Sequence, residues 1–251
     1  MWDDVVSELD QWRAERRVAQ FWWRDDDAVD VTPQLKSLVK MAEQFDLPIA
    51  LSVIPAQFSP RLARYVLRHP RVSVLVHGHS HVNHAPSGRA KSEFGGTRPL
   101  ASMEAELLAG LDHVRRAFGA QSLPVLVPPW NRMAPRLVQR LPALGYRGIS
   151  AWKPRLPREK LGPLVRVNTH LDPVDWRRGR IPKTDRAVAA ALLRKLRWRR
   201  AHPERAQEPL GLLTHHLLWG PEIEHVIGQI LMHTRPHPAV RWVSARMAFR
   251  D

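Results

Sequence analysis

The chain has 251 residues, of which 44% are hydrophobic, and it carries a formal net charge of +15. This length suits one β/α barrel, so we expect a single domain over residues 1–251. The absence of cysteine excludes disulfide bonds and thiolate metal sites. Any metal ion must therefore be held by His, Asp, Glu or carbonyl oxygen.

The 39 basic residues are scattered along the chain rather than gathered in one arm. Scattered charge favours a solvated surface over a binding patch, so no nucleic-acid partner is expected. No segment approaches the roughly 20 apolar residues that span a bilayer, and no basic stretch followed by an apolar run opens the chain. We expect a cytoplasmic protein without a membrane partner, and the sequence leaves its oligomeric state open.

Short apolar strands alternate with helical segments along the chain. The sequence Thr32-Pro33 marks a helix start, because Thr caps the first turn and Pro suits the first helical position. In chain order, we predict a helix over 2–19, a strand over 21–23, a helix over 32–45, a strand over 48–54, a helix over 60–68, a strand over 72–76, a helix over 100–118, a strand over 124–127, a helix over 134–144, strands over 147–151 and 164–168, a helix over 184–201, a strand over 210–214, a helix over 221–234 and a strand over 240–243. This alternation predicts β/α units around a parallel sheet or barrel.

Polar clusters follow the predicted strands. They comprise Asp25 to Asp27, His77 to His84, Trp130 to Arg132, His170 to Asp175, and the pair His215 and His216. The loops at the carboxyl ends of barrel strands share one rim, so these clusters are expected to converge although they are distant in sequence.

The segment from His77 to His84 packs four imidazoles into eight residues. Imidazole suits Zn, Ni, Co or Fe, and a pair of His four residues apart at a strand end can point at one ion. The alternative is a polar loop whose His side chains cap the next helix or bond the backbone. Four His in one loop favour the metal site.

Three adjacent carboxylates, Asp25 to Asp27, end a Trp-rich strand. Because neighbouring carboxylates repel, the run predicts a cation on one of them, with Arg24 or another donor for the rest. One Asp would then ligate the metal while a neighbour serves as general base. The alternative is an acidic turn that caps the following helix.

Weaker signals come from the remaining clusters. A His after the strand 210–214 could donate a proton, because its pKa near 6.5 suits proton exchange at neutral pH. The turn from Pro128 to Arg132 offers an aromatic face and a cation for a sugar ring, although Trp at such a turn is as often plain packing. His170 and Asp175 are interpreted as rim residues.

Taken in order, these clusters resemble the polysaccharide deacetylase family, carbohydrate esterase family four, which uses a divalent metal to remove acetyl groups from N-acetylated sugars. Its first motif, Thr-Phe-Asp-Asp-Gly, resembles the segment from Arg24 to Ala28. Placing Ala28 on the motif Gly implies that Asp26 is the base and Asp27 a metal ligand, with a shift of one residue left open.

The second motif, His-Thr/Ser-x-x-His, resembles the spacing of His77 and His81, which implies that both bind the metal. His79 and His84 remain as rival ligands or substrate contacts. The last motif, Leu-x-His, resembles Leu213-Thr214-His215 and implies that His215 is the general acid.

The third motif, Arg-x-Pro-aromatic-Gly, resembles the segment from Val127 to Asn131, in which Val127 replaces the motif Arg. In the family that Arg helps to orient the base, and Arg132 is a candidate substitute. The fourth motif, built around Asp and Trp, is only faintly echoed by Asp175 and Trp176.

The resemblance implies a distorted β/α barrel of about seven parallel strands. It also implies a metal-dependent deacetylase that acts on an N-acetylated sugar or polysaccharide, with Zn as the favoured ion and Ni, Co and Fe as alternatives. The predicted site comprises the catalytic residues Asp26 and His215, the ligands Asp27, His77 and His81, and the substrate contacts Trp130, Asn131, Arg132, His84, His170, Asp175 and His216. Two alternatives stay open: an amidohydrolase for a small non-carbohydrate amide, and a silent metal- or sugar-binding relative.

Overall fold

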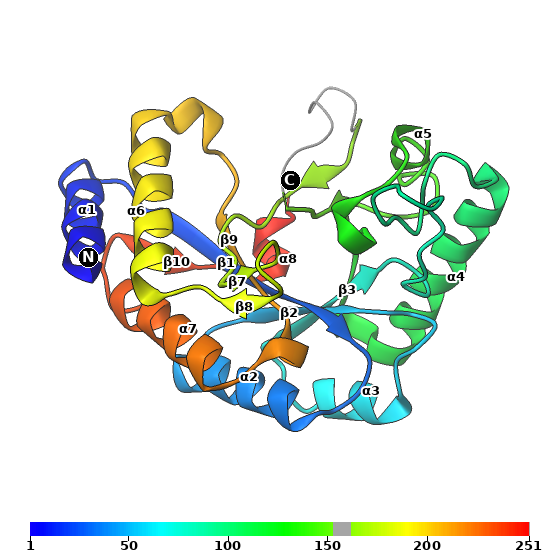
Figure 1. Cartoon of the computed structure of the whole chain (residues 1–251), viewed down its shortest axis with the longest axis horizontal. Coiled ribbons are helices and arrows are strands. Elements are labelled where there is room, and N and C mark those ends of the chain that lie inside the picture. Colours follow the sequence, from blue (N-terminus) through cyan, green and yellow to red (C-terminus); the bar gives the residue numbers. More distant parts are fainter. Residues whose placement is uncertain (153–161, 251) are drawn as a thin grey trace.

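The computed structural model describes residues 1–152 and 162–250, and a parallel sheet forms its centre (Figure 1). The strand order is β10-β1-β2-β3-β4-β5-β6. β10 and β2 pair with successive parts of one edge of β1, and β9 pairs with the opposite edge. These strands are β1 (Ala19–Ala28), β2 (Ile49–Val53), β3 (Val72–His77), β4 (Ser122–Val127), β5 (Gly148–Ile149), β6 (Val165–Arg166), β9 (Leu210–Thr214) and β10 (Val240–Trp242). A separate antiparallel hairpin joins β7 (Val174–Asp175) to β8 (Ile181–Pro182).

Helices cover the outside of this sheet, with α1 beside α6 on one flank and α4 on the other (Figure 1). They are α1 (Trp2–Ala14), α2 (Pro33–Gln44), α3 (Pro60–Val66), α4 (Leu100–Phe118), α5 (Pro135–Val138), α6 (Asp185–Ala201) and α7 (Pro221–Thr234), whereas α8 (Ala245–Ala248) packs against the inner face of the sheet. The predicted start of α2 is confirmed, because the Thr32 side chain accepts the Leu35 N–H and Pro33 occupies the first turn. None of the described helices is long and apolar enough to span a membrane.

The sheet curls until its two ends meet through the segment 167–171. Val167 donates its backbone N–H to Ile149 on β5, while Leu213 on β9 donates to Leu171 at 2.8 Å. An isolated parallel bridge joins Leu171 to Leu212. The predicted distorted β/α barrel is thereby confirmed, with short strands and a seam in place of regular closure.

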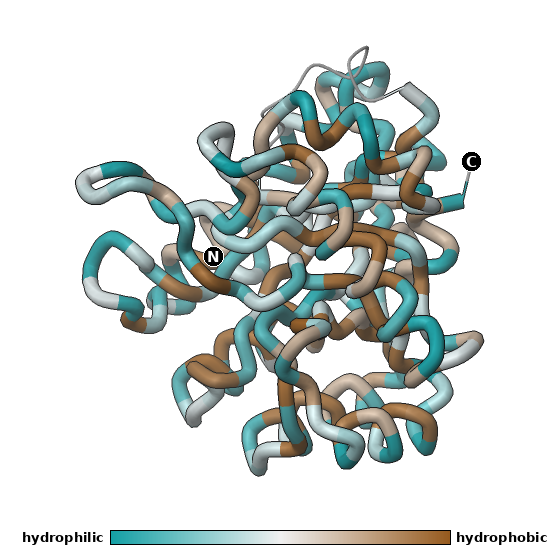
Figure 2. The backbone as a smooth tube through the Cα atoms, turned by 90° about the vertical axis from the view of Figure 1, so that its right-hand side faces the viewer, coloured by the Kyte–Doolittle hydropathy of each residue, from teal (hydrophilic) through white to brown (hydrophobic). Residues whose placement is uncertain are grey.

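The strands have two buried faces, which separate the core into two clusters. The larger cluster joins the outward side chains, such as Phe21 and Trp23, to the covering helices. The smaller one, which includes Trp22, Val125 and Val127, fills the inside of the barrel. Figure 2 shows hydrophobic stretches along the central strands and mixed hydropathy on the outer helices. Because strand side chains alternate, residues two positions after Trp22 also face the interior.

Several predicted bounds differ from the structure. The first strand continues to Ala28 instead of ending at residue 23, because β9 and β2 supply hydrogen-bonding partners on both edges. The helix predicted over 134–144 is α-helical only over α5, and turns that include Pro142 follow it over residues 139–145. The hairpin of β7 and β8 and the short helix α8 were not predicted, since two to four residues carry too little periodicity.

Candidate metal centre

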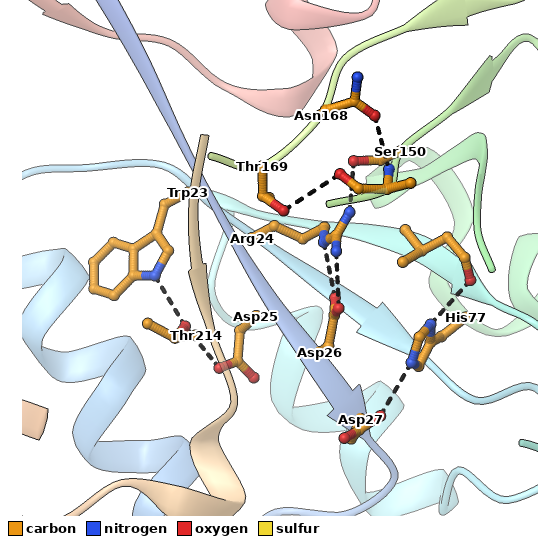
Figure 3. A network of polar contacts seen from close by, with 12 residues as sticks. Trp23, Arg24, Asp25, Asp26, Asp27, His77, Ser150, Asn168, Thr169 and Thr214 are labelled. Carbon is orange, nitrogen blue, oxygen red and sulfur yellow. Dashed lines mark hydrogen bonds and ion pairs between the residues drawn. The ribbon is translucent and has the colours of Figure 1, made fainter. Parts of the chain in front are cut away.

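The three consecutive carboxylates at the end of β1, Asp25 to Asp27, point in different directions. Asp26 follows Trp22 and Arg24 on the interior face, whereas Asp25 lies on the opposite face with Trp23 (Figure 3). The pairing with β2 shifts register between Asp25 and Ala28, and Asp27 adopts a left-handed φ of 69°. This bulge turns Asp27 toward His77 at the end of β3, so that the consecutive carboxylates of Asp26 and Asp27 lie at the same end of the barrel.

Asp27, His77 and His81 converge as the sequence resemblance implied. The Asp27 Oδ1 lies 3.0 Å from the His77 Nε2 and 3.4 Å from the His81 Nε2. Within residues 1–152 and 162–250, these three form the single His, Cys, Asp or Glu group whose ligand atoms lie within 4.8 Å of one another. His79 and His84, the rival ligands, are not part of it.

The donor set fits a divalent metal ion. The His77 Nδ1 lies 2.9 Å from the Val127 carbonyl oxygen, and because that oxygen only accepts, Nδ1 must carry the hydrogen. The His77 Nε2 lies 3.0 Å from the Asp27 Oδ1, so a proton on Nε2 satisfies this contact, and a divalent ion would replace that proton. Burial raises the pKa of Asp27, but the hydrogen bond and charge of His77 outweigh this and hold that pKa far below its usual range.

The loop that carries His81 is organised by Glu93, which the sequence did not single out. Glu93 is fully buried, and its carboxylate accepts the backbone N–H groups of His79, Ser80 and His81 at 2.7 to 3.2 Å. Gly78, with a φ of 64°, lets the carboxylate approach, since a Cβ there would lie 2.1 Å from a Glu93 oxygen. No sequence signal identified Glu93, because its partners are backbone groups.

Asp26 is held by Arg24 from the same strand (Figure 3). The Arg24 Nε lies 2.9 Å from Oδ1 of Asp26, and its Nη2 donates to Oδ2 at 2.9 Å. Arg24 also donates from Nη1 to the Ser150 hydroxyl at 2.6 Å. Burial raises the pKa of Asp26, but the Arg24 charge and the nearby His77 outweigh it, so the net pKa is lowered. Asp26 is therefore an ionised, oriented carboxylate.

Asp25 faces the helices and binds His216. The His216 Nδ1 lies 2.6 Å from the Asp25 Oδ1, and both side chains are fully buried. The Thr214 hydroxyl donates to the other Asp25 oxygen at 2.8 Å and receives the Trp23 indole N–H at 3.0 Å. His216 is thus a partner of Asp25 in the core, and this placement does not support its predicted contact with substrate.

His215 lies at the end of β9 beside the β7–β8 hairpin. Its ring meets the Trp176 ring edge-on, with centroids 4.7 Å apart, and the Trp176 indole donates to Asp172 at 2.7 Å. Burial raises the pKa of Asp172, while the charge of His215 opposes this shift. Because Thr214 pairs with Asp25 in the parallel strands β9 and β1, His215 follows at the same end of the sheet as Asp26 and Asp27.

Of the predicted substrate contacts, Trp130 adjoins the ligands. Its ring centroid lies 4.3 Å from that of His81, and Trp130 and Asn131 both have positive φ. Arg132 instead points along the loop, where Nη1 donates to the Lys91 carbonyl at 3.2 Å. The guanidinium that contacts Asp26 is that of Arg24.

Three further predicted contacts lie in other surroundings. His170 bonds Glu208 at 3.0 Å and receives the Gly211 N–H at the barrel seam. Asp175 caps its own turn by accepting the backbone N–H groups that follow it. His84 is exposed, and its backbone N–H donates to Ser92. The structure does not bring these three side chains to the metal ligands.

Comparison with known proteins places the fold. No protein-family model matches the chain, and no curated protein sequence matches it. Several solved structures do match the chain. One is a family 4 acetyl xylan esterase from Clostridium thermocellum in complex with a cobalt ion. Its TM-score is 0.58 and its sequence identity 12%, and the match covers 92% of this chain and 90% of that one. A family 4 carbohydrate esterase from Streptomyces lividans, in complex with acetate, has a TM-score of 0.55 and 16% identity over 92% and 95%.

A third similar structure is a CE4 family pseudoenzyme from Bacillus anthracis, with a TM-score of 0.59 and 12% identity over 93% of this chain and 66% of that chain. The likeness extends over nine tenths of the chain at very low sequence identity, so it concerns the course of the backbone. The resemblance read from the short motifs is thus confirmed for the fold, and the chain has the fold of the polysaccharide deacetylases of carbohydrate esterase family four.

Proposed function

We propose that the protein is a metal-dependent deacetylase that removes an acetyl group from an N-acetylated sugar. The observation that carries this proposal is the convergence of Asp27, His77 and His81 beside an ionised carboxylate, Asp26. A metal triad alone would suit storage or a structural role. A free carboxylate next to it supplies the base that hydrolysis needs.

Asp27, His77 and His81 would hold the ion, and Zn is the favoured one, with Ni, Co and Fe as alternatives. When bound, a divalent ion activates water and polarises the acyl carbonyl. Asp26 accepts the proton from the attacking water; each of its oxygens contacts Arg24 and keeps a further lone pair for this purpose. His215 then protonates the departing amine.

The substrate proposal rests on the aromatic side chains around the site. The Trp130 ring lies against His81, and the Trp176 ring lies against His215. Trp176 is 44% exposed, and the Arg180 guanidinium lies over its ring at 5.9 Å from the centroid. Aromatic faces flanking a polar centre suit the apolar face of a sugar ring, which favours an N-acetylated sugar over a small linear amide.

The test combines metal analysis with an assay of acetate release from chitooligosaccharides. We expect one divalent ion per chain, loss of activity on chelation, and recovery on adding Zn or Co. Asp26→Asn should retain the ion and lose turnover by about 100-fold or more, as general-base catalysis requires. A protein that binds no divalent ion would refute the proposal.

The second candidate is a silent metal-binding relative. It is favoured by Val127, which replaces the motif Arg, and by the pseudoenzyme among the similar structures. A metal-loaded protein that releases no acetate from any N-acetylated sugar, and whose Asp26→Asn variant behaves identically to wild type, would support this candidate. Release of a product from a small amide, but not from sugars, would instead indicate an amidohydrolase.

A further inference from the structure

The side chain that orients Asp26 comes from an unexpected place. Position 127, where the motif resemblance expects an Arg, is a fully buried Val in the apolar cluster inside the barrel. Arg132, the nearby candidate, donates to the Lys91 carbonyl. The guanidinium that contacts Asp26 belongs to Arg24, two residues earlier on the same strand.

The position of Arg24 on β1 explains the contact. Side chains at i and i+2 of a strand share one face, so Arg24 and Asp26 both enter the barrel interior beyond Trp22. The two nitrogens of Arg24 that contact Asp26 meet separate carboxylate oxygens, both at 2.9 Å. One contact is a hydrogen bond and the other an ion pair, and together they restrain the orientation of the carboxylate as well as its place.

Arg24 is itself rigidly held. Its side chain is fully buried, and its third nitrogen donates to the Ser150 hydroxyl, which is also fully buried at the end of β5. The guanidinium thus spans the barrel interior between β1 and the far side of the sheet. Such a buried cation is costly unless it has a fixed partner, and Asp26 is the carboxylate it contacts.

We infer that Arg24 is the positioning residue for the catalytic base, supplying from β1 the guanidinium that position 127 lacks. The inference rests on the proposed function, in which Asp26 accepts a proton. Among the described residues, the Arg24 guanidinium contacts Asp26 and Ser150 and none of the three proposed metal ligands, so it acts through Asp26. Its removal should therefore lower kcat with little change in KM or in metal binding.

The test uses the metal-loaded protein and the variants Arg24→Met, Arg24→Lys, Asp26→Asn and the double variant Arg24→Met with Asp26→Asn. Titration with Co(II), followed by absorption, reports the metal site, and acetate release reports kcat and KM. We expect Arg24→Met to bind Co(II) within about threefold of wild type and to lose about 100-fold in kcat. Arg24→Lys should recover part of that loss, since it keeps the charge but not the planar fork.

The decisive comparison is the effect of Arg24→Met in the two backgrounds. If Arg24 acts through Asp26, Arg24→Met should lower kcat little in a protein that already carries Asp26→Asn. An equal loss in both backgrounds, or loss of Co(II) binding together with activity, would overturn the inference. The matched control is Arg71→Met, which breaks a surface ion pair with Asp46 and should leave kcat unchanged.

Thermal unfolding distinguishes failure of the inference from failure of the proposed function. Arg24→Met should lower Tm by about 10 °C, because it strands a buried carboxylate, and adding Asp26→Asn should restore part of that loss. A wild-type protein that releases no acetate refutes the proposed function, while the melting temperatures still report the pairing. Absence of any recovery in the double variant would refute the pairing itself.

Discussion

At the scale of single residues, each of the three consecutive carboxylates has its own partner. Asp25 binds His216, Asp26 binds Arg24, and Asp27 meets the metal-site His side chains. Strand alternation sends Asp25 and Asp26 to opposite faces, and the bulge redirects Asp27. Repulsion within the run is thereby relieved, because each carboxylate has a separate partner. The sequence predicted a partner for the run but could not assign His216, which depends on the register of β1 with β9.

Asp25→Asn tests the structural role of the first carboxylate. It breaks a fully buried pair with His216, so we expect the free energy of unfolding to fall by about 3 kcal/mol. Metal affinity should stay within about threefold of wild type, because Asp25 faces the helices. Urea unfolding and Co(II) titration measure the two quantities. A variant that loses metal and keeps its stability would show that the assignments of Asp25 and Asp27 are reversed.

Asp27→Asn should mainly affect metal binding. Loss of a ligand charge is expected to weaken divalent-metal affinity by at least about 100-fold, more than removal of an outer partner would. The stability of the metal-free protein should fall too, because the Asp27 charge pairs with His77, but by less than in Asp25→Asn, since the Asp27 side chain is 28% exposed. Co(II) titration and urea unfolding in a chelator are the measurements. Undiminished affinity would mean that the ion lies elsewhere.

At the scale of elements, the site depends on a loop that the strand pattern could not predict. The spacing of His77 and His81 was visible in the sequence, but their convergence needs the turn at Gly78 and the buried Glu93 carboxylate beneath it. Glu93 lies in an irregular segment and bonds backbone N–H groups, so its role leaves no periodic or motif signal. Long periodic segments such as α4 were predicted with their observed bounds.

Gly78→Ala tests the packing beneath this loop. A Cβ at residue 78 would clash with Glu93 and Pro129, and the φ of 64° adds backbone strain. We therefore expect the free energy of unfolding to fall by about 3 kcal/mol and metal binding to weaken. Gly88→Ala is the matched control, because Gly88 has a φ of 75° but no atom within 4 Å of the added Cβ. Gly88→Ala should lower the free energy of unfolding by about 1 kcal/mol and leave metal affinity unchanged. Equal effects of the two substitutions would argue against the contact with Glu93.

At the scale of the whole molecule, the barrel is held closed at one seam. The segment 167–171 bonds β5 at its start and β9 at its end, and Glu208 fastens it by accepting from the Asn168 N–H at 2.8 Å and pairing with His170. The sequence predicted a strand here but not its double pairing, because closure depends on contacts between residues 40 positions apart. His170 was expected at the substrate rim, and its contacts with Glu208 and Gly211 place its half-buried side chain at the seam.

Glu208 makes the stability of this seam dependent on pH. Burial raises the pKa of Glu208, but the hydrogen bond to His170, with the Asn168 N–H and the Arg199 charge, outweighs it, and the net pKa lies below the ordinary value of 4.5. A depressed carboxyl pKa stabilises the folded state above the unfolded value, and that contribution is lost as the pH falls through the folded value. We therefore expect Glu208→Gln to be less stable than wild type by about 2 kcal/mol at pH 6, with a difference that shrinks below pH 4.5.

Urea unfolding of both proteins between pH 3 and pH 6 measures this difference, with buffers matched in ionic strength because the chain carries a charge of +15. Asp112→Asn is the control: it removes an exposed ion pair with Arg116 and should change stability by less than about 0.5 kcal/mol throughout. A difference between wild type and Glu208→Gln that persists unchanged at pH 3 would mean that the Glu208 charge does not hold the seam. In that case the backbone pairing of Leu171 with β9 would be sufficient to close the barrel.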